Sequence, residues 1–158
     1  MSNGTAAWRP LIDAATAGTT VAPLLLEAIM EVESDGENLR LNAAKAAGLM
    51  QIVSSVWPEA LQATRIALGL PAASPGDLVM MPEVNVRAAV RILTYLRSQH
   101  GDWDTAVRAY HGFGSDGIST DRHSCDSVAL EDSQVCVIPY ARLEALCHGF
   151  SGLQHQLH

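Results

Sequence analysis

The amino-acid sequence predicts a mainly helical protein that forms a single compact domain. Apolar residues recur at the spacing of an amphipathic helix in several segments, and no segment alternates at a period of two for long. The chain has 158 residues and a hydrophobic content of 48%, which is enough for a core without disulfides or metal ions. No internal repeat is visible, so we treat positions 1–158 as one domain.

Start and stop signals divide this domain into the expected helices. Most of the helices begin near a capping residue or a proline, and several end at a glycine. The expected helices cover positions 8–17, 23–34, about 58–68 after a cap at Ser54 or Ser55, 82–99, 103–110 and 139–149. Between them we expect a surface loop at 71–82 and a long irregular loop at 112–134 that lies near the functional site.

The charge pattern argues against two classes of protein. The net charge is −7, and the ten Lys and Arg residues form no visible cluster, whereas nucleic-acid binding depends on clustered basic residues. The longest apolar runs are far shorter than the roughly 20 residues that a membrane span requires. We therefore expect neither a nucleic-acid partner nor a transmembrane helix.

The segment Pro23–Ser34 places one carboxyl group on the wrong side of an amphipathic helix. At the helical period Glu33 falls in the middle of a broad apolar arc, whereas Glu27 and Glu31 lie on the solvated side. A carboxyl on the core side must be desolvated, paired or protonated. A carboxyl held neutral near neutral pH is what general-acid catalysis requires. The alternative is that Glu33 lies in a frayed last turn and has no role.

Several ordered motifs resemble one protein family. Glu33-Ser34 is followed by Gly-Leu-Met-Gln at 48–51, in which Gln51 lies eighteen positions after the acid, and by Ala-Tyr-His-Gly at 109–112. A Pro-Glu-Val-Asn stretch at 82–85 and a tyrosine that opens a late helix continue the pattern. These motifs resemble the soluble lytic transglycosylase (SLT) family, whose fold is like that of goose-type lysozyme, and they span about positions 21–148. The resemblance suggests a tiny β-hairpin near positions 38–47. Separately, we expect the tail at 151–158 to be frayed.

The resemblance implies cleavage of the β-1,4 bond between N-acetylmuramic acid and N-acetylglucosamine in peptidoglycan. Glu33 would act first as acid and then as base while the C6 hydroxyl of the muramic acid attacks C1 and gives a 1,6-anhydro end. One carboxyl then suffices, and we find no second acid at a comparable position on a helix. The other aspartates considered are better explained as caps or loop residues: Asp102, Asp104, Asp116 and Asp121. We expect a monomer that binds glycan strands and needs no cofactor and no metal ion.

By the same resemblance, further residues would bind the substrate. Met50 would pack on a sugar face, with a core position as the alternative, and Gln51 would hold an acetamido or hydroxyl group. Gly48 would keep the backbone close to the sugar. Tyr110 would orient or tune Glu33, and its alternative is a buried tyrosine bonded to a carbonyl. The remaining candidates are Ser34 beside the acid, Asn42, His111, and Tyr140, which could equally be a packing residue.

Two residues depart from the family pattern. The family usually has asparagine where this sequence has His111, and many members have serine where it has Asn42. His111 keeps a donor and an acceptor but adds a titratable group. If it faces Glu33, a charged His111 would lower the pKa of the acid and narrow the useful pH range. Asn42 can make the same kind of bond to an N-acetyl group as serine.

The cysteines leave three arrangements open. Cys125, Cys136 and Cys147 cannot all pair within one chain. A Cys125–Cys136 bridge, three free thiols, and a metal site that includes His123 are the alternatives. The spacing of these residues matches no usual zinc pattern, which argues against the metal site.

The first twenty residues lack both the basic start and the apolar stretch of a secretory signal. If the chain is complete, we expect a cell-wall activity to reach the periplasm or the exterior by another route, such as a phage lysis pore or a virion. If a leader peptide has been removed from the sequence, this expectation about the route no longer applies. Two other functions also stay open, namely a hydrolytic muramidase that uses a loop aspartate and water, and a wall-binding or virion structural module without turnover.

Overall fold

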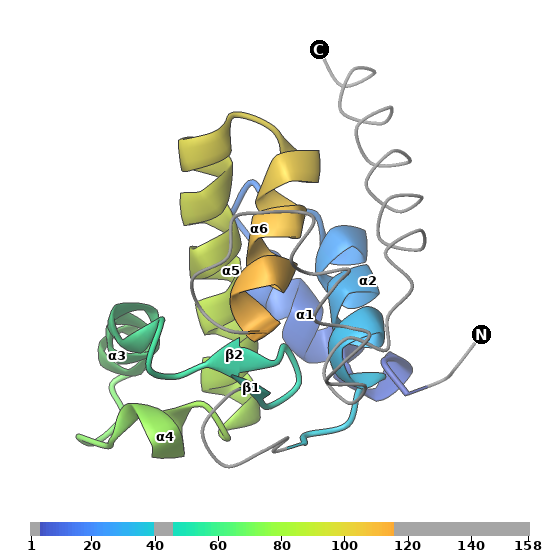
Figure 1. Cartoon of the computed structure of the whole chain (residues 1–158). Coiled ribbons are helices and arrows are strands. Elements are labelled where there is room, and N and C mark those ends of the chain that lie inside the picture. The colour runs from blue at the N-terminus through green and yellow to red at the C-terminus, as the bar shows by residue number, and fades with distance from the viewer. Residues whose placement is uncertain (1–3, 40–45, 116–158) are drawn as a thin grey trace.

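The computed structural model describes residues 4–39 and 46–115, which form a mainly helical fold with one tiny hairpin (Figure 1). The elements in chain order are η1 (Ala6–Trp8), α1 (Arg9–Thr16), α2 (Pro23–Ser34), β1 (Ala46–Ala47), β2 (Ile52–Val53), α3 (Pro58–Ala67), α4 (Pro75–Leu78), α5 (Pro82–His100) and α6 (Trp103–Ser115). The predicted fold class, a mainly helical lysozyme-like domain, is confirmed. That the whole chain is one domain stays a prediction.

Helix α5 is the centre of the described fold. It packs against α1, α3 and α6, and Figure 1 shows it running alongside α6. The sequence predicts its apolar face correctly, because every residue expected there is buried: Val86, Ala89, Val90, Leu93 and Leu96. Burial of a Val or Leu side chain stabilises a fold by roughly 1.5–3 kcal/mol, so this face makes a large contribution.

Prolines mark where several helices begin, and residues in the left-handed backbone conformation mark where two of them end. Proline is the first residue of α2, α3, α4 and α5, a position that lacks an intrahelical partner for its N–H in any case. Gly101 ends α5 at φ 84°, and Asp35 ends α2 at φ 54°. As a result α2 stops directly after Ser34, which leaves Glu33 in its last turn.

The hairpin that the structure describes extends further along the chain than the sequence predicted. Its strands are antiparallel, with Ala46 opposite Val53 and Ala47 opposite Ile52. The turn between them is the Gly-Leu-Met-Gln motif itself, in which Gly48 has φ 81° and Gln51 has φ 48°. The first strand thus lies at the end of the expected range of 38–47 and the second lies beyond it, because the glycine motif forms the turn. Residues 40–45 lie outside the described residues, so the rest of that prediction is not tested.

Two further details of the predicted helices need correction. Helix α3 begins at Pro58 without a side-chain cap, since its N-cap residue is Trp57 rather than Ser54 or Ser55. The expected loop at 71–82 contains the short helix α4, where the Ser74 hydroxyl accepts a hydrogen bond from the Asp77 N–H at 3.2 Å. A serine followed by a proline is a sufficient start signal even for a single turn.

Helix α6 is longer than predicted. It continues beyond Tyr110 to Ser115, so Tyr110 and His111 lie inside the helix and not at its end. A glycine within a helix costs only about 1 kcal/mol relative to alanine, so Gly112 does not end it. Predictions for Asn42, Tyr140, the three cysteines, the last helix and the tail fall outside the described residues.

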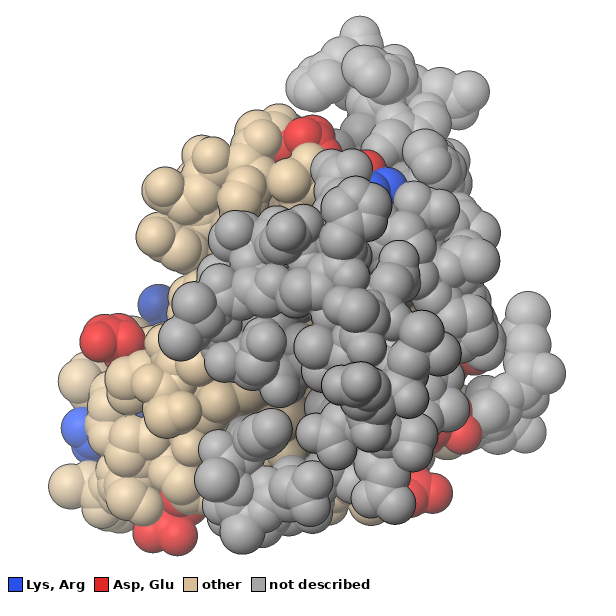
Figure 2. Space-filling view, in the orientation of Figure 1, with Lys and Arg blue, Asp and Glu red and all other residues tan. Residues whose placement is uncertain are grey.

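Two findings concern the surface and the helices. In the space-filling view of Figure 2, the acidic and basic side chains on the described part of that face lie scattered, without a basic patch. None of the helices in residues 4–39 and 46–115 is long and apolar enough to cross a membrane.

Candidate active site

The Glu33 carboxyl lies in the last turn of α2 and is nearly buried. Its side chain is only 10% exposed, and the helix packs an apolar face against the core. Leu26, Ile29 and Met30 of the same helix are in the core. A carboxyl in such a place needs a polar partner, since an unpaired buried charge is costly.

The partner of Glu33 is His111, which α6 brings from 78 positions away in the sequence. Nδ1 of His111 lies 3.1 Å from Oε1 of Glu33, and the His111 side chain is 11% exposed. When Nδ1 carries a proton, it donates a hydrogen bond to the carboxylate, and a protonated carboxyl can donate to the bare nitrogen instead. The pair can therefore hold one proton in two places.

Tyr110 joins α6 to the hairpin turn. Its hydroxyl donates a hydrogen bond of 2.7 Å to the carbonyl oxygen of Met50. Burial raises the pKa of Tyr110 well above the ordinary 10.0, and the nearby negative charge of Glu33 raises it further. The phenol therefore stays protonated and bonded to a carbonyl, which is the structural alternative considered for this residue, while Glu33 lies close enough to act on it.

Ser34 joins α2 to the same turn. Its hydroxyl donates to the carbonyl oxygen of Leu49 at 2.6 Å and accepts a hydrogen bond from the Gly36 N–H at 3.2 Å. The side chain is buried, so these bonds hold the end of α2 against the hairpin. Ser34 thus positions the backbone next to Glu33, and its hydroxyl is already engaged.

Asn85 of α5 holds the hairpin turn at 48–51 by hydrogen bonds, a role that the sequence did not reveal. It is fully buried, and its amide nitrogen donates to the carbonyl oxygens of Ala47 at 3.0 Å and Val79 at 2.8 Å. Its amide oxygen accepts from the Met50 N–H at 2.8 Å. The available signal was a polar residue on the buried face of an expected helix, and a buried amide is nearly always fully hydrogen-bonded.

Gly48 is required by this contact. At φ 81° it lies in the left-handed region, and a Cβ atom there would collide with the Asn85 side chain and the Val79 carbonyl. The resemblance implies a close approach of this backbone to the substrate, and the structure shows a close approach to Asn85 of α5. Gly48 therefore lets the hairpin turn pack on the central helix.

The side chains of Met50 and Gln51 point into the protein. Met50 is fully buried, which matches its core alternative rather than contact with a sugar face. Gln51 is 4% exposed, and its amide nitrogen donates to the carbonyl oxygens of Gly48 at 2.8 Å and Leu39 at 3.2 Å. In this structure both residues shape the turn on which the site is built.

The structure therefore brings together the predicted acid, its histidine neighbour, the tyrosine and the glycine-led turn. In the described part of the chain, no group of three or more His, Cys, Asp and Glu side chains could hold a metal ion. A nearly buried carboxyl within hydrogen-bonding distance of an imidazole is typical of an enzyme that uses acid–base chemistry.

The comparison with protein families identifies the class. The model of the transglycosylase SLT domain matches residues 10–123, which is most of the chain. The protein belongs to the SLT transglycosylase family. No curated protein matches the chain significantly.

Proposed function

We propose that this protein is a peptidoglycan lytic transglycosylase that cleaves the bond between N-acetylmuramic acid and N-acetylglucosamine. The observation that carries the proposal is the Glu33–His111 pair, a nearly buried carboxyl 3.1 Å from an imidazole, in a chain of the SLT family. A proton donor sheltered from bulk water is what protonation of a glycosidic oxygen needs.

The proposed reaction uses one carboxyl twice. Protonated Glu33 gives its proton to the leaving oxygen as the C1–O4 bond breaks. The C6 hydroxyl of the muramic acid then attacks C1, and the Glu33 carboxylate takes up the hydroxyl proton, so the acid is restored and no water is consumed. Because the nucleophile belongs to the substrate, much of the entropic cost of bringing it to C1 is already met.

The surroundings of the acid support this single-carboxyl route over hydrolysis. A hydrolytic enzyme commonly uses a second carboxylate to activate water or to act as nucleophile. Asp102 accepts hydrogen bonds from the Thr105 N–H and hydroxyl as the cap of α6, and Asp104 forms an ion pair with Arg108 at 3.1 Å. Both are engaged within α6 and its cap, and the other two aspartates considered from the sequence, Asp116 and Asp121, lie outside the described residues.

His111 has a specific role in the proposal. It holds the carboxyl in place and stabilises the carboxylate that exists after the proton has left. Ser34, Gly48, Met50, Gln51 and Tyr110 act as positioning residues, because their polar groups or side chains are engaged inside the protein. Direct contact with the sugars by Asn42 and Tyr140 stays a prediction.

Mass spectrometry of purified sacculi digested by the parent protein and by Glu33→Gln tests the proposal. We expect the parent to release fragments with an anhydro end, which is one water lighter than a hydrolysed end, and the variant to release none. Hydrolysed ends would overturn the proposal in favour of a muramidase. Binding to sacculi without any new ends would overturn it in favour of a wall-binding module.

A further inference from the structure

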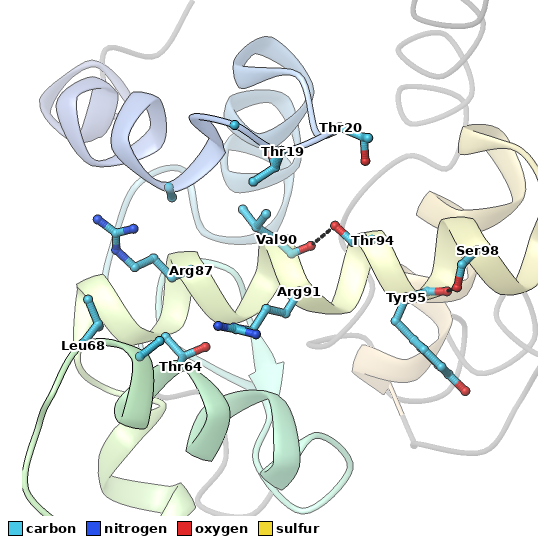
Figure 3. Close-up of a pocket in the computed structure, with 13 residues that line it drawn as sticks. Thr19, Thr20, Thr64, Leu68, Arg87, Val90, Arg91, Thr94, Tyr95 and Ser98 are labelled. Carbon is cyan, nitrogen blue, oxygen red and sulfur yellow. Dashed lines mark hydrogen bonds between the residues drawn. The ribbon is translucent and has the colours of Figure 1, made fainter.

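A second site of interest lies away from Glu33, in an open groove bordered by α1, α3 and α5. The groove has a volume of about 770 Å³. Figure 3 shows the side chains of Arg87 and Arg91 extending from α5 at the groove, with Thr19 and Thr20 on one side and Thr64 on the other. We call it the Arg87–Arg91 groove.

This groove and the candidate active site lie on opposite faces of α5. Successive residues of an α-helix are about 100° apart, so Arg87 and Arg91 lie about 200° and 240° around the axis from Asn85. Asn85 holds the hairpin turn next to Glu33, as its bonds to Met50 and Ala47 show. A ligand in the groove would therefore not compete with a glycan strand at Glu33.

The charge of the groove differs from that of the molecule. The chain carries a net charge of −7, yet the charged side chains among the described residues that line the groove are the two arginines. Arg87 forms an exposed ion pair with Glu83 at 3.2 Å, which is weak in water. Arg91 is exposed and has no hydrogen bond or ion pair within residues 4–39 and 46–115. A guanidinium left unpaired in a groove is available to an anionic ligand.

The geometry favours a carboxylate-bearing chain over a single small ion. Residues four apart on a helix have Cβ atoms about 6 Å apart, so the two guanidinium groups can bind successive anionic groups. Tyr95 lies at the edge of the groove, is 52% exposed, and its ring packs against the Trp57 ring with centroids 6.1 Å apart. An exposed, supported aromatic ring offers a flat surface for a sugar or peptide group.

We propose that the Arg87–Arg91 groove binds carboxylate groups of peptidoglycan stem peptides on a strand other than the one being cleaved. The choice of ligand rests on the proposed function, which makes peptidoglycan the substrate. Free carboxylates are regular features of these peptides, and the groove supplies the matching cations. Contact with two strands at once would raise the time that the protein spends on the wall, because the second contact forms at a high local concentration.

Cosedimentation with purified sacculi tests the groove. All proteins carry Glu33→Gln so that the sacculi stay intact. Three variants are compared with this parent: the single variant Arg91→Gln, the double variant Arg87→Gln/Arg91→Gln, and the single variant Arg9→Gln. The last variant is the matched control, since it removes the same charge from a partly exposed arginine outside the groove. We expect Arg91→Gln to weaken binding about fivefold and the double variant about tenfold or more, with Arg9→Gln within about twofold of the parent.

Two further arms identify the ligand and guard against misfolding. Removal of stem peptides with an amidase should lower binding of the parent to the level of the double variant, and Arg91→Lys, which keeps a cation, should restore much of the binding. Equal binding by parent and double variant would overturn the inference. So would a loss that appears only on sacculi that carry teichoic acid, because phosphate would then be the ligand. Binding is measured without turnover, so a parent that makes no new chain ends contradicts the proposed function alone.

Discussion

Two carboxylates of one helix, Glu27 and Glu33, are both largely shielded from water, yet their partners differ in kind. Oε2 of Glu27 lies 2.8 Å from Nη2 of Arg9, and its side chain is 17% exposed. Glu33 instead faces His111. A guanidinium is charged at every pH of interest, whereas an imidazole gains or loses its charge near neutral pH.

The difference shows how a partner decides what a carboxylate does. The pair with Arg9 ties α1 to α2, and because the guanidinium keeps its charge the pair is suited to a structural role. The pair with His111 can be charged or neutral, and it lies against a turn that three separate elements support. The periodicity of α2 predicts a solvated Glu27, and this is wrong because periodicity does not reveal that Arg9 of α1 lies against it.

The largest expected effect comes from removing each carboxylate in turn. Glutamine keeps the shape of glutamate but cannot deliver a proton in the same way. We expect Glu33→Gln to lower the rate of release of soluble fragments from sacculi by about 10²–10⁴-fold, the usual contribution of a general acid. Glu27→Gln should stay within roughly twofold of the parent, because a partly exposed pair contributes at most about 1 kcal/mol to stability. Equal losses in both variants would remove the distinction between the two carboxylates.

The next effect concerns the support beneath the Glu33 end of α2. Asn85→Ala would leave the Met50 N–H and two buried carbonyls without a partner, so we expect it to lower the free energy of unfolding by about 3 kcal/mol. Gln99→Ala, an exposed amide on the same helix, should change it by less than about 0.5 kcal/mol. Denaturant titration measures both, and similar values for the two variants would show that Asn85 does not support the turn.

A smaller effect is expected when the partners of the two carboxylates, His111 and Arg9, are replaced. His111→Asn removes a titratable group but keeps a donor, so we expect activity to be retained and the pH profile of activity to change. The reason is that a charged imidazole favours the ionised carboxylate, and an amide does not. Arg9→Gln should leave the pH profile of activity unchanged. A His111→Asn profile identical to that of the parent would show that His111 does not act on the acid.

The smallest effect concerns Tyr110 at alkaline pH. The pKa of the buried phenol is raised above its ordinary 10.0, so the folded state holds this proton more tightly than the unfolded state. The stabilisation is therefore complete below pH 10 and is lost as the pH rises from there through the raised pKa. We expect the parent to lose about 1 kcal/mol more than Tyr110→Phe between pH 8 and pH 11, measured by denaturant titration. A parallel decline in the two proteins would contradict this reading.

The sequence predicts the helices well because their signals are local. Proline starts, glycine stops and the apolar face of α5 depend on residues a few positions apart, and the structure confirms them. The ordered motifs also predicted the family, since Glu33, Gln51 and His111 carry its pattern even where one of them departs from it.

The roles of individual site residues could not be predicted in the same way. Whether the amide of Gln51 or the hydroxyl of Ser34 is free for a ligand depends on carbonyl groups that other segments supply. Periodicity predicts which side of a helix a residue faces, but it does not predict which backbone N–H or C=O group of another segment lies within hydrogen-bonding distance. Asn85 was not predicted as a site residue for the same reason. Its hydrogen-bond partners lie on the hairpin and on the segment before α5.

Gly36, whose N–H donates to the Ser34 hydroxyl, also contacts residues near the start of the described chain. The turn after Ser34 passes Gly36, where a Cβ atom would collide with the backbone of Gly4, and the Gly36 carbonyl accepts a hydrogen bond of 2.8 Å from the Trp8 indole. The opening residues of the chain thus brace the same turn that ends the acid-bearing helix. A change at Gly4 or Trp8 is therefore expected to act on the last turn of α2, although both residues lie far from Glu33 in the sequence.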